Sequence, residues 1–218
     1  MQPSKIGHYI AAECEKDLTK HGDNFRGAGY TKSRKETQNQ YELMLNVIRE
    51  ENEIISLLDF GCGPGHLLDF KLSKDKYNQV DYAGLDLSDA YLNAFKKRHA
   101  TSKLFKLDIL SESHLLPNFD YIVLNGVFNY RGNVAREEMV IYWKEILNAV
   151  FHHADKGIAF NIMSKLVDWE RDDLFHMSFD EMAAFVSSSL SRHFVVHHDY
   201  GTYEYTTYVY KDPTYSPF

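Results

Sequence analysis

Short apolar runs alternate with longer amphipathic stretches through the middle of the chain. Apolar runs of strand length occupy residues 54–60, 80–86, 104–107, 119–124 and 157–163. Helical spacing separates several of them, over residues 65–73, 89–99 and 136–152. Repeated strand–helix–strand units make successive strands parallel and cover both faces of the sheet with helices. The pattern therefore predicts a doubly wound α/β fold.

The C-terminal third has a different rhythm. A capping-box sequence at Ser178 to Glu181 opens a predicted helix that runs to about residue 190. Two strand-like runs follow, 193–200 and 204–210, joined by a very short connection around Gly201. Such a connection requires an antiparallel hairpin. The prediction is therefore a seven-stranded, mostly parallel sheet that ends in this hairpin.

Two further helical stretches, residues 6–18 and 33–49, precede the first strand. The loop between them, residues 21–30, combines glycines with Phe25, Arg26 and Tyr30. We interpret residues 1–50 as a helical cap or substrate lid belonging to the same domain as residues 51–218. The loop itself has two interpretations, a flap over the site or a surface turn anchored by Phe25.

Composition limits the possible settings and partners. A chain of 218 residues with 44% hydrophobic content supports one substantial core. No signal-like or membrane-length apolar run is present, so we expect a cytoplasmic protein without a membrane partner. The formal net charge of -7 disfavours a nucleic-acid partner, because binding to phosphates favours a basic surface. Cys14 and Cys62 show no metal-ligand spacing, and we expect no metal.

Three closely spaced glycines, Gly61, Gly63 and Gly65, stand between the first predicted strand and a helix. Glycines there let the backbone approach a ligand and direct the N–H groups of the helix N-terminus toward an anionic group. The dinucleotide fingerprint G-x-G-x-x-G would need its third glycine at the position of His66. A dinucleotide site is therefore disfavoured.

The stretch 58–65, Leu-Asp-Phe-Gly-Cys-Gly-Pro-Gly, resembles the first motif of the class I S-adenosylmethionine-dependent methyltransferases almost residue for residue. The loop of residues 21–30 also resembles the corresponding loop of a group of small, uncharacterised bacterial-type methyltransferases. The resemblance implies S-adenosylmethionine as cofactor and S-adenosylhomocysteine as product. It further implies that Gly61, Cys62, Gly63 and Gly65 lie along the methionine part of the cofactor, supported by Asp59.

The later motifs of that family also have counterparts. Asp86, followed by Leu87, matches the acidic residue that holds both ribose hydroxyls, and a carboxylate suits a vicinal diol because it accepts two hydrogen bonds. Asp108 and Ile109 match the residues that reach the adenine amine and pack on its ring. The resemblance also implies that the segment beginning Asn125-Gly126 lines the transferred methyl group.

The predicted function is methyl transfer to an oxygen or nitrogen nucleophile of a small molecule, by a monomer or homodimer. Two alternatives stay open: a methyltransferase that acts on protein or RNA, and a non-catalytic S-adenosylmethionine-binding module. Methylation of DNA bases is disfavoured, because residues 125–128 lack the two prolines of the corresponding signature.

The residues that carry the acceptor chemistry are less well specified. Catalytic candidates are His198, His66 and Asn125. In an alternating strand His197 and His198 face opposite sides, so at most one of the two points toward a given pocket. Substrate candidates are Tyr9, Arg26, Tyr30, Phe128 and Asn129.

Overall fold

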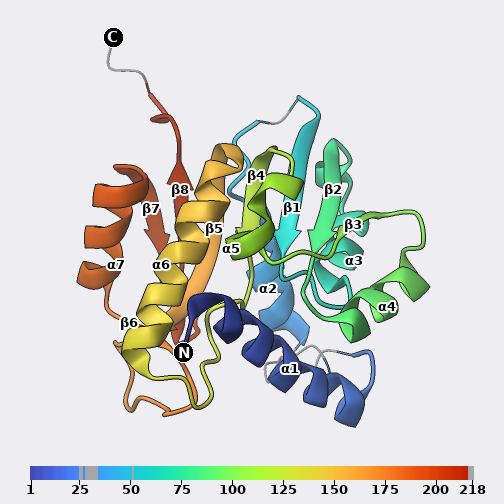
Figure 1. Ribbon diagram of the computed structural model, residues 1–218. Helices are drawn as coiled ribbons and strands as arrows, with labels where there is room; N and C mark the ends of the chain where they lie inside the picture. Colours follow the sequence, from blue (N-terminus) through green and yellow to red (C-terminus); the bar gives the residue numbers. More distant parts are fainter. Residues whose placement is uncertain (25–26, 28–33, 51, 216–218) are drawn as a thin grey trace.

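A computed structural model describes residues 1–24, 27, 34–50 and 52–215, and its centre is a single twisted sheet (Figure 1). The strands are β1 (Ile55–Phe60), β2 (Val80–Leu85), β3 (Lys103–Phe105), β4 (Phe119–Leu124), β5 (Ala154–Ser164), β6 (His176–Met177), β7 (His193–His197) and β8 (Glu204–Tyr210). Their order across the sheet is β3-β2-β1-β4-β5-β8-β7.

The predicted sheet is confirmed, including its antiparallel end. Strands β1 to β5 pair in parallel, whereas β8 runs antiparallel to both β5 and β7. The two-residue strand β6 was not predicted; it pairs in parallel with Met163 and Ser164 at the end of β5. A strand of two residues is too short to show a hydrophobic periodicity in the sequence, so only the tertiary structure reveals it.

The helices largely follow the predicted positions. They are α1 (Pro3–His21), α2 (Arg34–Leu45), α3 (His66–Leu72), α4 (Asp89–Arg98), α5 (Ile109–Glu112), α6 (Arg136–His152) and α7 (Phe179–Phe185), with the short 3₁₀-helices η1 (Asp75–Tyr77) and η2 (Ser113–Leu115) and the π-helix η3 (Val186–Leu190). The Ser88 hydroxyl caps α4 by accepting the N–H of Tyr91 at 3.0 Å. Ser178 caps α7 in the same way, from Glu181 at 3.2 Å.

Alternating side chains on the parallel strands supply two separate cores. On β1, Leu57 faces a cluster formed with α2, α3 and α4, whereas Leu58 faces a cluster centred on α6. Trp143 of α6 is completely buried in the second cluster. Its truncation to alanine would cost about 3–5 kcal/mol. Helices therefore cover both faces, and the doubly wound fold is confirmed.

Helices α1 and α2 lie at the edge of the sheet where the parallel strands end (Figure 1). Ile6 of α1 is fully buried, and a Cβ on Gly7 would come within 3.0 Å of the Tyr142 hydroxyl and 3.2 Å of the Leu87 side chain. Glycine therefore allows α1 to lie close to α6 and to the segment after β2. Over the described residues, no helix combines the length and apolar character needed to cross a membrane.

Candidate active site

A cavity of about 1000 Å³ opens at the carboxyl edge of the sheet. Its walls come from the segments that follow β1, β2, β3 and β4, from β5 and the start of β8, and from α1 and α2. Strands β1 and β4 are neighbours in the sheet although they are not consecutive in the chain. Open α/β sheets bind ligands at this kind of topological switch point.

The glycine loop after β1 forms the floor of one end of the cavity. The N–H groups of Gly61 and Cys62 both donate to the Leu85 carbonyl, at 2.7 and 3.0 Å, and so tie the loop to the end of β2. Gly63 has a φ of +52°, and a Cβ placed on it would meet no atom within 4 Å. Its backbone is therefore open toward the cavity, as the motif requires.

Gly65 has a different part in the loop. It begins α3 with a φ of +90°, and a Cβ there would lie 2.8 Å from the Phe95 ring. It is not among the residues that line the cavity. Gly65 thus allows α3 to pack closely against α4, behind the loop that faces the ligand space.

Asp86, at the end of β2, is held rigidly beside this loop. Its Oδ2 accepts the N–H of Gly63 and its Oδ1 accepts the N–H of Ser88, both at 2.9 Å. Burial raises the pKa of this carboxyl to about 6, against the opposing effect of the backbone hydrogen bonds. Both oxygens are oriented by backbone rather than by flexible side chains.

Asp59 lies deeper, at the end of β1. The Tyr82 hydroxyl donates to its Oδ2 at 2.6 Å. Burial raises the pKa of Asp59 to about 7; the Tyr82 hydrogen bond opposes this rise and the nearby charge of Asp86 adds to it. Two buried carboxyl groups therefore make this end of the cavity favourable for a cation.

Asp108 and Ile109 follow β3 and line the same end of the cavity, together with Leu87. Asp108 caps α5 because its Oδ1 accepts the Leu110 N–H at 3.0 Å. Ile109 is 2% exposed and offers an apolar wall next to that carboxylate. A carboxylate beside an apolar surface suits a flat ring that carries an amino group.

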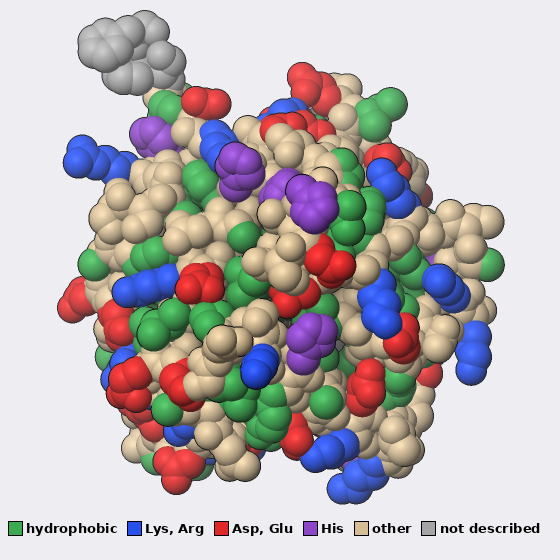
Figure 2. Space-filling model, in the orientation of Figure 1, with side chains coloured by type: hydrophobic (Ala, Val, Ile, Leu, Met, Phe, Trp, Pro, Cys, Tyr) green, Lys and Arg blue, Asp and Glu red, His purple; other side chains and the backbone are tan. Residues whose placement is uncertain are grey.

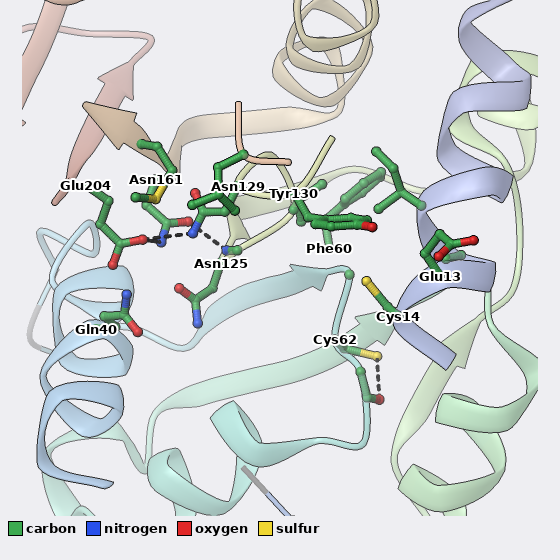
Figure 3. A pocket seen from close by; sticks show the side chains of 18 of the residues that line it. Glu13, Cys14, Gln40, Phe60, Cys62, Asn125, Asn129, Tyr130, Asn161 and Glu204 are labelled. Atoms are coloured by element: carbon green, nitrogen blue, oxygen red, sulfur yellow. Dashed lines mark hydrogen bonds between the residues drawn. The ribbon is translucent and has the colours of Figure 1, made fainter. Parts of the chain in front are cut away.

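A buried polar cluster forms the opposite end of the cavity. Glu204, the first residue of β8, accepts hydrogen bonds on Oε2 from Asn129 at 2.8 Å and from Asn161 at 3.0 Å. Asn161 also accepts the N–H of Gly126 at 2.6 Å. We call Asn129, Asn161 and Glu204 the Glu204 cluster; Figure 3 shows its side chains meeting, with Asn125 and Gln40 nearby.

Asn161, Glu204 and Gln40 were not among the sequence candidates. Asn161 did leave a signal, because it interrupts the apolar run of β5. Glu204 left none. It reaches Asn161 because β5 and β8 pair in a register that sets Met163 opposite Glu204, which makes Asn161 and Glu204 diagonal neighbours on one face.

Several predicted site residues lie away from the cavity. Phe128 is fully buried between the rings of Tyr142 and Phe160, so it belongs to the core. Tyr9 is turned toward the loop before α6, where its hydroxyl accepts the N–H of Asn133 at 3.3 Å. Neither Phe128 nor Tyr9 lines the cavity. Arg26 and Tyr30 fall outside the described residues.

His198 also lies outside the cavity. It follows the edge strand β7 and packs against the rings of Phe179 and Tyr205, with centroids 5.2 and 6.4 Å away. His197 instead contacts Tyr208, so the two histidines do face opposite sides of the sheet. An edge strand is too far from the switch point between β1 and β4 to supply a base there.

His66 and Asn125 do line the cavity. The His66 ring lies 3.2 Å from Asp23, and this contact joins α3 to the segment after α1. Burial and the nearby positive charge of Arg98 lower the pKa of His66. Asn125 directly follows β4. Among the described residues, no group of three or more His, Cys, Asp or Glu side chains has a metal-binding arrangement.

The sequence matches one family model and is similar to known proteins. A family model described as a methyltransferase domain matches residues 58–157. The chain is 28% identical over 158 residues to "Putative methyltransferase Rv1506c" of Mycobacterium tuberculosis, covering 72% of this chain and 93% of that protein. It is also 30% identical over 145 residues to uncharacterized protein RP028 of Rickettsia prowazekii, covering 64% of this chain and 53% of that protein.

Solved structures share the fold at low sequence identity. Magnesium protoporphyrin IX methyltransferase (ChlM) from Synechocystis PCC 6803 with bound S-adenosylhomocysteine has a TM-score of 0.65, 13% identity, and coverage of 96% of this chain and 99% of that chain. DesVI of Streptomyces venezuelae has a TM-score of 0.57 and 16% identity, with 81% and 92% coverage. Residues 58–157 therefore match a methyltransferase domain, and the chain has the fold of S-adenosylmethionine-dependent methyltransferases.

Proposed function

We propose that this methyltransferase transfers the methyl group to an oxygen or nitrogen nucleophile of a small molecule. The observation that carries the proposal is the position of the Glu204 cluster inside the cavity, where Glu204 and Asn161 are each 1% exposed. Polar groups this deep are within reach of a small acceptor that enters the cavity. A folded macromolecule would have to extend a single side chain or base that far.

The surface charge supports the same acceptor class. Acidic and basic side chains are interspersed over the face shown in Figure 2, without a continuous basic band. Binding to RNA draws much of its affinity from such a band. The name of ChlM also describes an enzyme that acts on a small molecule, magnesium protoporphyrin IX.

We further propose how the cofactor is held. The open backbone at Gly63 and the adjacent Gly61 and Cys62 would accommodate the methionine part, supported by Asp59. Asp86 would accept the ribose hydroxyls, and Asp108 with Ile109 would bind adenine. The cavity volume of about 1000 Å³ leaves room for an acceptor beside the cofactor.

S-adenosylmethionine supplies a methyl group already activated by a positively charged sulfur. The chain therefore has to position the nucleophile and exclude water, and alignment alone contributes several kcal/mol to such reactions, about 7–11 at best. The buried carboxyl groups of Asp59 and Asp86 would favour the cationic cofactor over neutral competitors. Asn125 and Gly126, after β4, are our candidates for the lining near the methyl group.

We propose that α1 acts as a lid over the cofactor end. Its Glu15 accepts the Ser88 hydroxyl at 2.5 Å, and the carbonyl of Cys14 accepts the Tyr91 hydroxyl at 2.9 Å. Tyr91 also donates to the carbonyl of Gly27 at 3.1 Å. These contacts join the N-terminal segment to residues just beyond Asp86, and the fully buried Ile6 anchors the first turns of α1 in the core.

Release of S-adenosylhomocysteine from separate pools tests the acceptor class. We expect release with a small-metabolite extract and none above background with protein or RNA from the same cells. The Asp86→Ala variant should abolish the signal, which would exclude a contaminating enzyme. Release only with a macromolecular pool would overturn the proposal.

A further inference from the structure

We propose that the methyl acceptor is an amine, whose N–H groups donate to the side-chain carbonyl oxygens of Asn129 and Gln40. This inference rests on the proposed small-molecule function and specifies its acceptor. Both residues line the cavity, and Figure 3 shows Gln40 on α2 directed toward the space beside the Glu204 cluster.

The orientation of the Asn129 amide follows from its neighbour. A carboxylate accepts hydrogen bonds, so the Asn129 group that faces Glu204 at 2.8 Å must be the NH₂. The carbonyl oxygen then points away from Glu204. This Oδ1 atom is buried and has no hydrogen-bond partner among the described residues.

Asn161 provides a comparison within the same cluster. Its NH₂ also donates to Glu204, but its carbonyl oxygen accepts the Gly126 N–H at 2.6 Å and is satisfied within the protein. Asn129 has the same partner on one side and lacks a partner on the other. The unmatched acceptor is thus found at Asn129 and not at Asn161, although both residues line the cavity.

Gln40 gives the second, independent observation. The residue is 3% exposed, and its Oε1 atom also has no hydrogen-bond partner in the part of the chain that the structure describes. A buried acceptor without a donor costs about 1–3 kcal/mol. Two such carbonyl oxygens in one cavity are matched by a ligand that brings at least two donors, as an amino group does.

The charge of the cavity favours the same chemistry. Among the described lining residues the basic side chains of Lys and Arg are Lys16 and Arg171, which pair with Glu13 and Asp173 at 2.6 Å each. The acidic lining residues include Asp17, Asp59, Asp86, Asp108 and Glu204. A cavity of this charge attracts an ammonium ion and repels a carboxylate or phosphate.

Two exposed aromatic residues are among those that line the cavity. Trp169 is 72% exposed and Tyr203, next to Glu204 in sequence, is 59% exposed. Their rings offer an apolar surface to the body of an acceptor whose amino group is inside. Amines with an aromatic or aliphatic body therefore fit better than fully polar ones.

The reaction balances without another reagent. The lone pair of the neutral amine forms the new N–C bond, and the electron pair of the breaking C–S bond passes to sulfur. The alkylated nitrogen is then an ammonium, and it loses a proton to solvent. Donation of two N–H groups to Asn129 and Gln40 would leave the nitrogen lone pair directed away from both oxygens.

Three matched probes test the inference on the full chain saturated with S-adenosylhomocysteine. Benzylamine, benzyl alcohol and benzoate share one ring and differ in the polar group. By ligand-observed NMR we expect benzylamine to bind about tenfold more tightly than the other two or better. A tenfold difference in affinity corresponds to about 1.4 kcal/mol of binding free energy. Equal or tighter binding of the alcohol or benzoate, or no benzylamine binding at millimolar concentration, would overturn the inference.

Variants on α2 then test the contact itself. Gln40→Met removes the carbonyl oxygen at similar size and should weaken benzylamine binding about tenfold, while Gln40→Glu keeps an acceptor oxygen and should retain binding. Gln38→Met makes the same substitution at an exposed position of α2 and should have no effect. Equal benzylamine affinity in Gln40→Met and wild type would contradict the assignment.

A pH profile gives a readout that a purely structural role would not change. With amines that turn over, release of S-adenosylhomocysteine should rise with pH as the amine loses its proton. Amines of lower pKa should shift the profile to lower pH by the same interval. Turnover of alcohols alone would refute the amine but leave the small-molecule function intact, whereas turnover of macromolecules alone would refute both.

Discussion

The two ends of the cavity are built in different ways. At the proposed cofactor end, the glycine loop and Asp86 follow adjacent strands and are joined through a backbone group, in the bond from Gly63 to Asp86. At the proposed acceptor end, Asn129 and Asn161 reach Glu204 from 75 and 43 residues away, through side chains alone. One end depends on local chain geometry and the other on long-range packing.

This difference bears on specificity. A carboxylate held by backbone N–H groups keeps its position when surrounding side chains change. In the Glu204 cluster the hydrogen bonds to Glu204 come from the side chains of Asn129 and Asn161, and a single backbone N–H, that of Gly126, donates to Asn161. The same fold can therefore keep one cofactor while its acceptor changes by substitution at a few positions.

Removal of Asp86 should have the largest effect. We expect Asp86→Ala to weaken binding of S-adenosylmethionine about 100-fold, because two hydrogen bonds to a charged group and the support of Gly63 are lost together. Calorimetry measures the change. Asp89→Ala, three residues further on and exposed, is the control and should bind like wild type. If Asp86→Ala bound S-adenosylmethionine as tightly as wild type, the proposal that this end of the cavity holds the cofactor would be wrong.

A change at Glu204 should act on the other end alone. In Glu204→Gln the two asparagines lose their charged acceptor, so we expect about 1–2 kcal/mol lower unfolding free energy and about tenfold lower kcat/KM for the acceptor. Affinity for S-adenosylmethionine should change less than about twofold, since the sites are separate. Urea unfolding, calorimetry and turnover distinguish these effects, with exposed Glu145→Gln as the matched control. A large loss of cofactor affinity would show that the ends are coupled.

A change of pH should lower the affinity for S-adenosylmethionine less than the Asp86→Ala substitution does. Asp86 has a pKa of about 6, and in the proposed mode of cofactor binding it must be ionised to accept the ribose hydroxyls. Affinity for S-adenosylmethionine should therefore fall about fourfold between pH 7.5 and about 5.5. Calorimetry across this range tests it, and Asp86→Asn should bind weakly with a flat profile. A flat profile in wild type would contradict the role of the ionised carboxylate.

Ionisation of Asp59 should lower the stability of the fold as the pH rises, whereas ionisation of Asp86 should raise the affinity for the cofactor. Its pKa is raised from 3.8 to about 7, so the folded state binds the proton more tightly than the unfolded state and ionisation destabilises the fold. Asp59→Asn should therefore exceed wild type in unfolding free energy at pH 8, and this advantage should shrink by about 1 kcal/mol at pH 6. Comparing the two proteins at each pH cancels the opposing contributions of His66 and His153, whose pKa values are lowered.

Most of the sheet was predictable because its strands are buried on both faces and read as continuous apolar runs. The glycine loop and Asp86 were predictable for a related reason: they directly follow such runs, so locating the strand also locates the residue. Phe128 and His198 show where this reasoning fails. Each of them also follows a strand, but tertiary packing sets the direction of the chain after a strand ends. As a result Phe128 packs in the core, and His198 lies beside the edge strand β7.

The sequence by itself determined the fold class, the strand ends that carry the candidate cofactor residues, and the cofactor, because each is encoded in short segments whose local geometry is nearly independent of the rest. The tertiary structure alone decided the proposed acceptor end. Gln40, Asn129, Asn161 and Glu204 come from α2, from the loop after β4, and from β5 and β8. They meet only because an antiparallel strand pairs in one register and a helix packs across the strand ends, and neither event is encoded next to the residues it brings together.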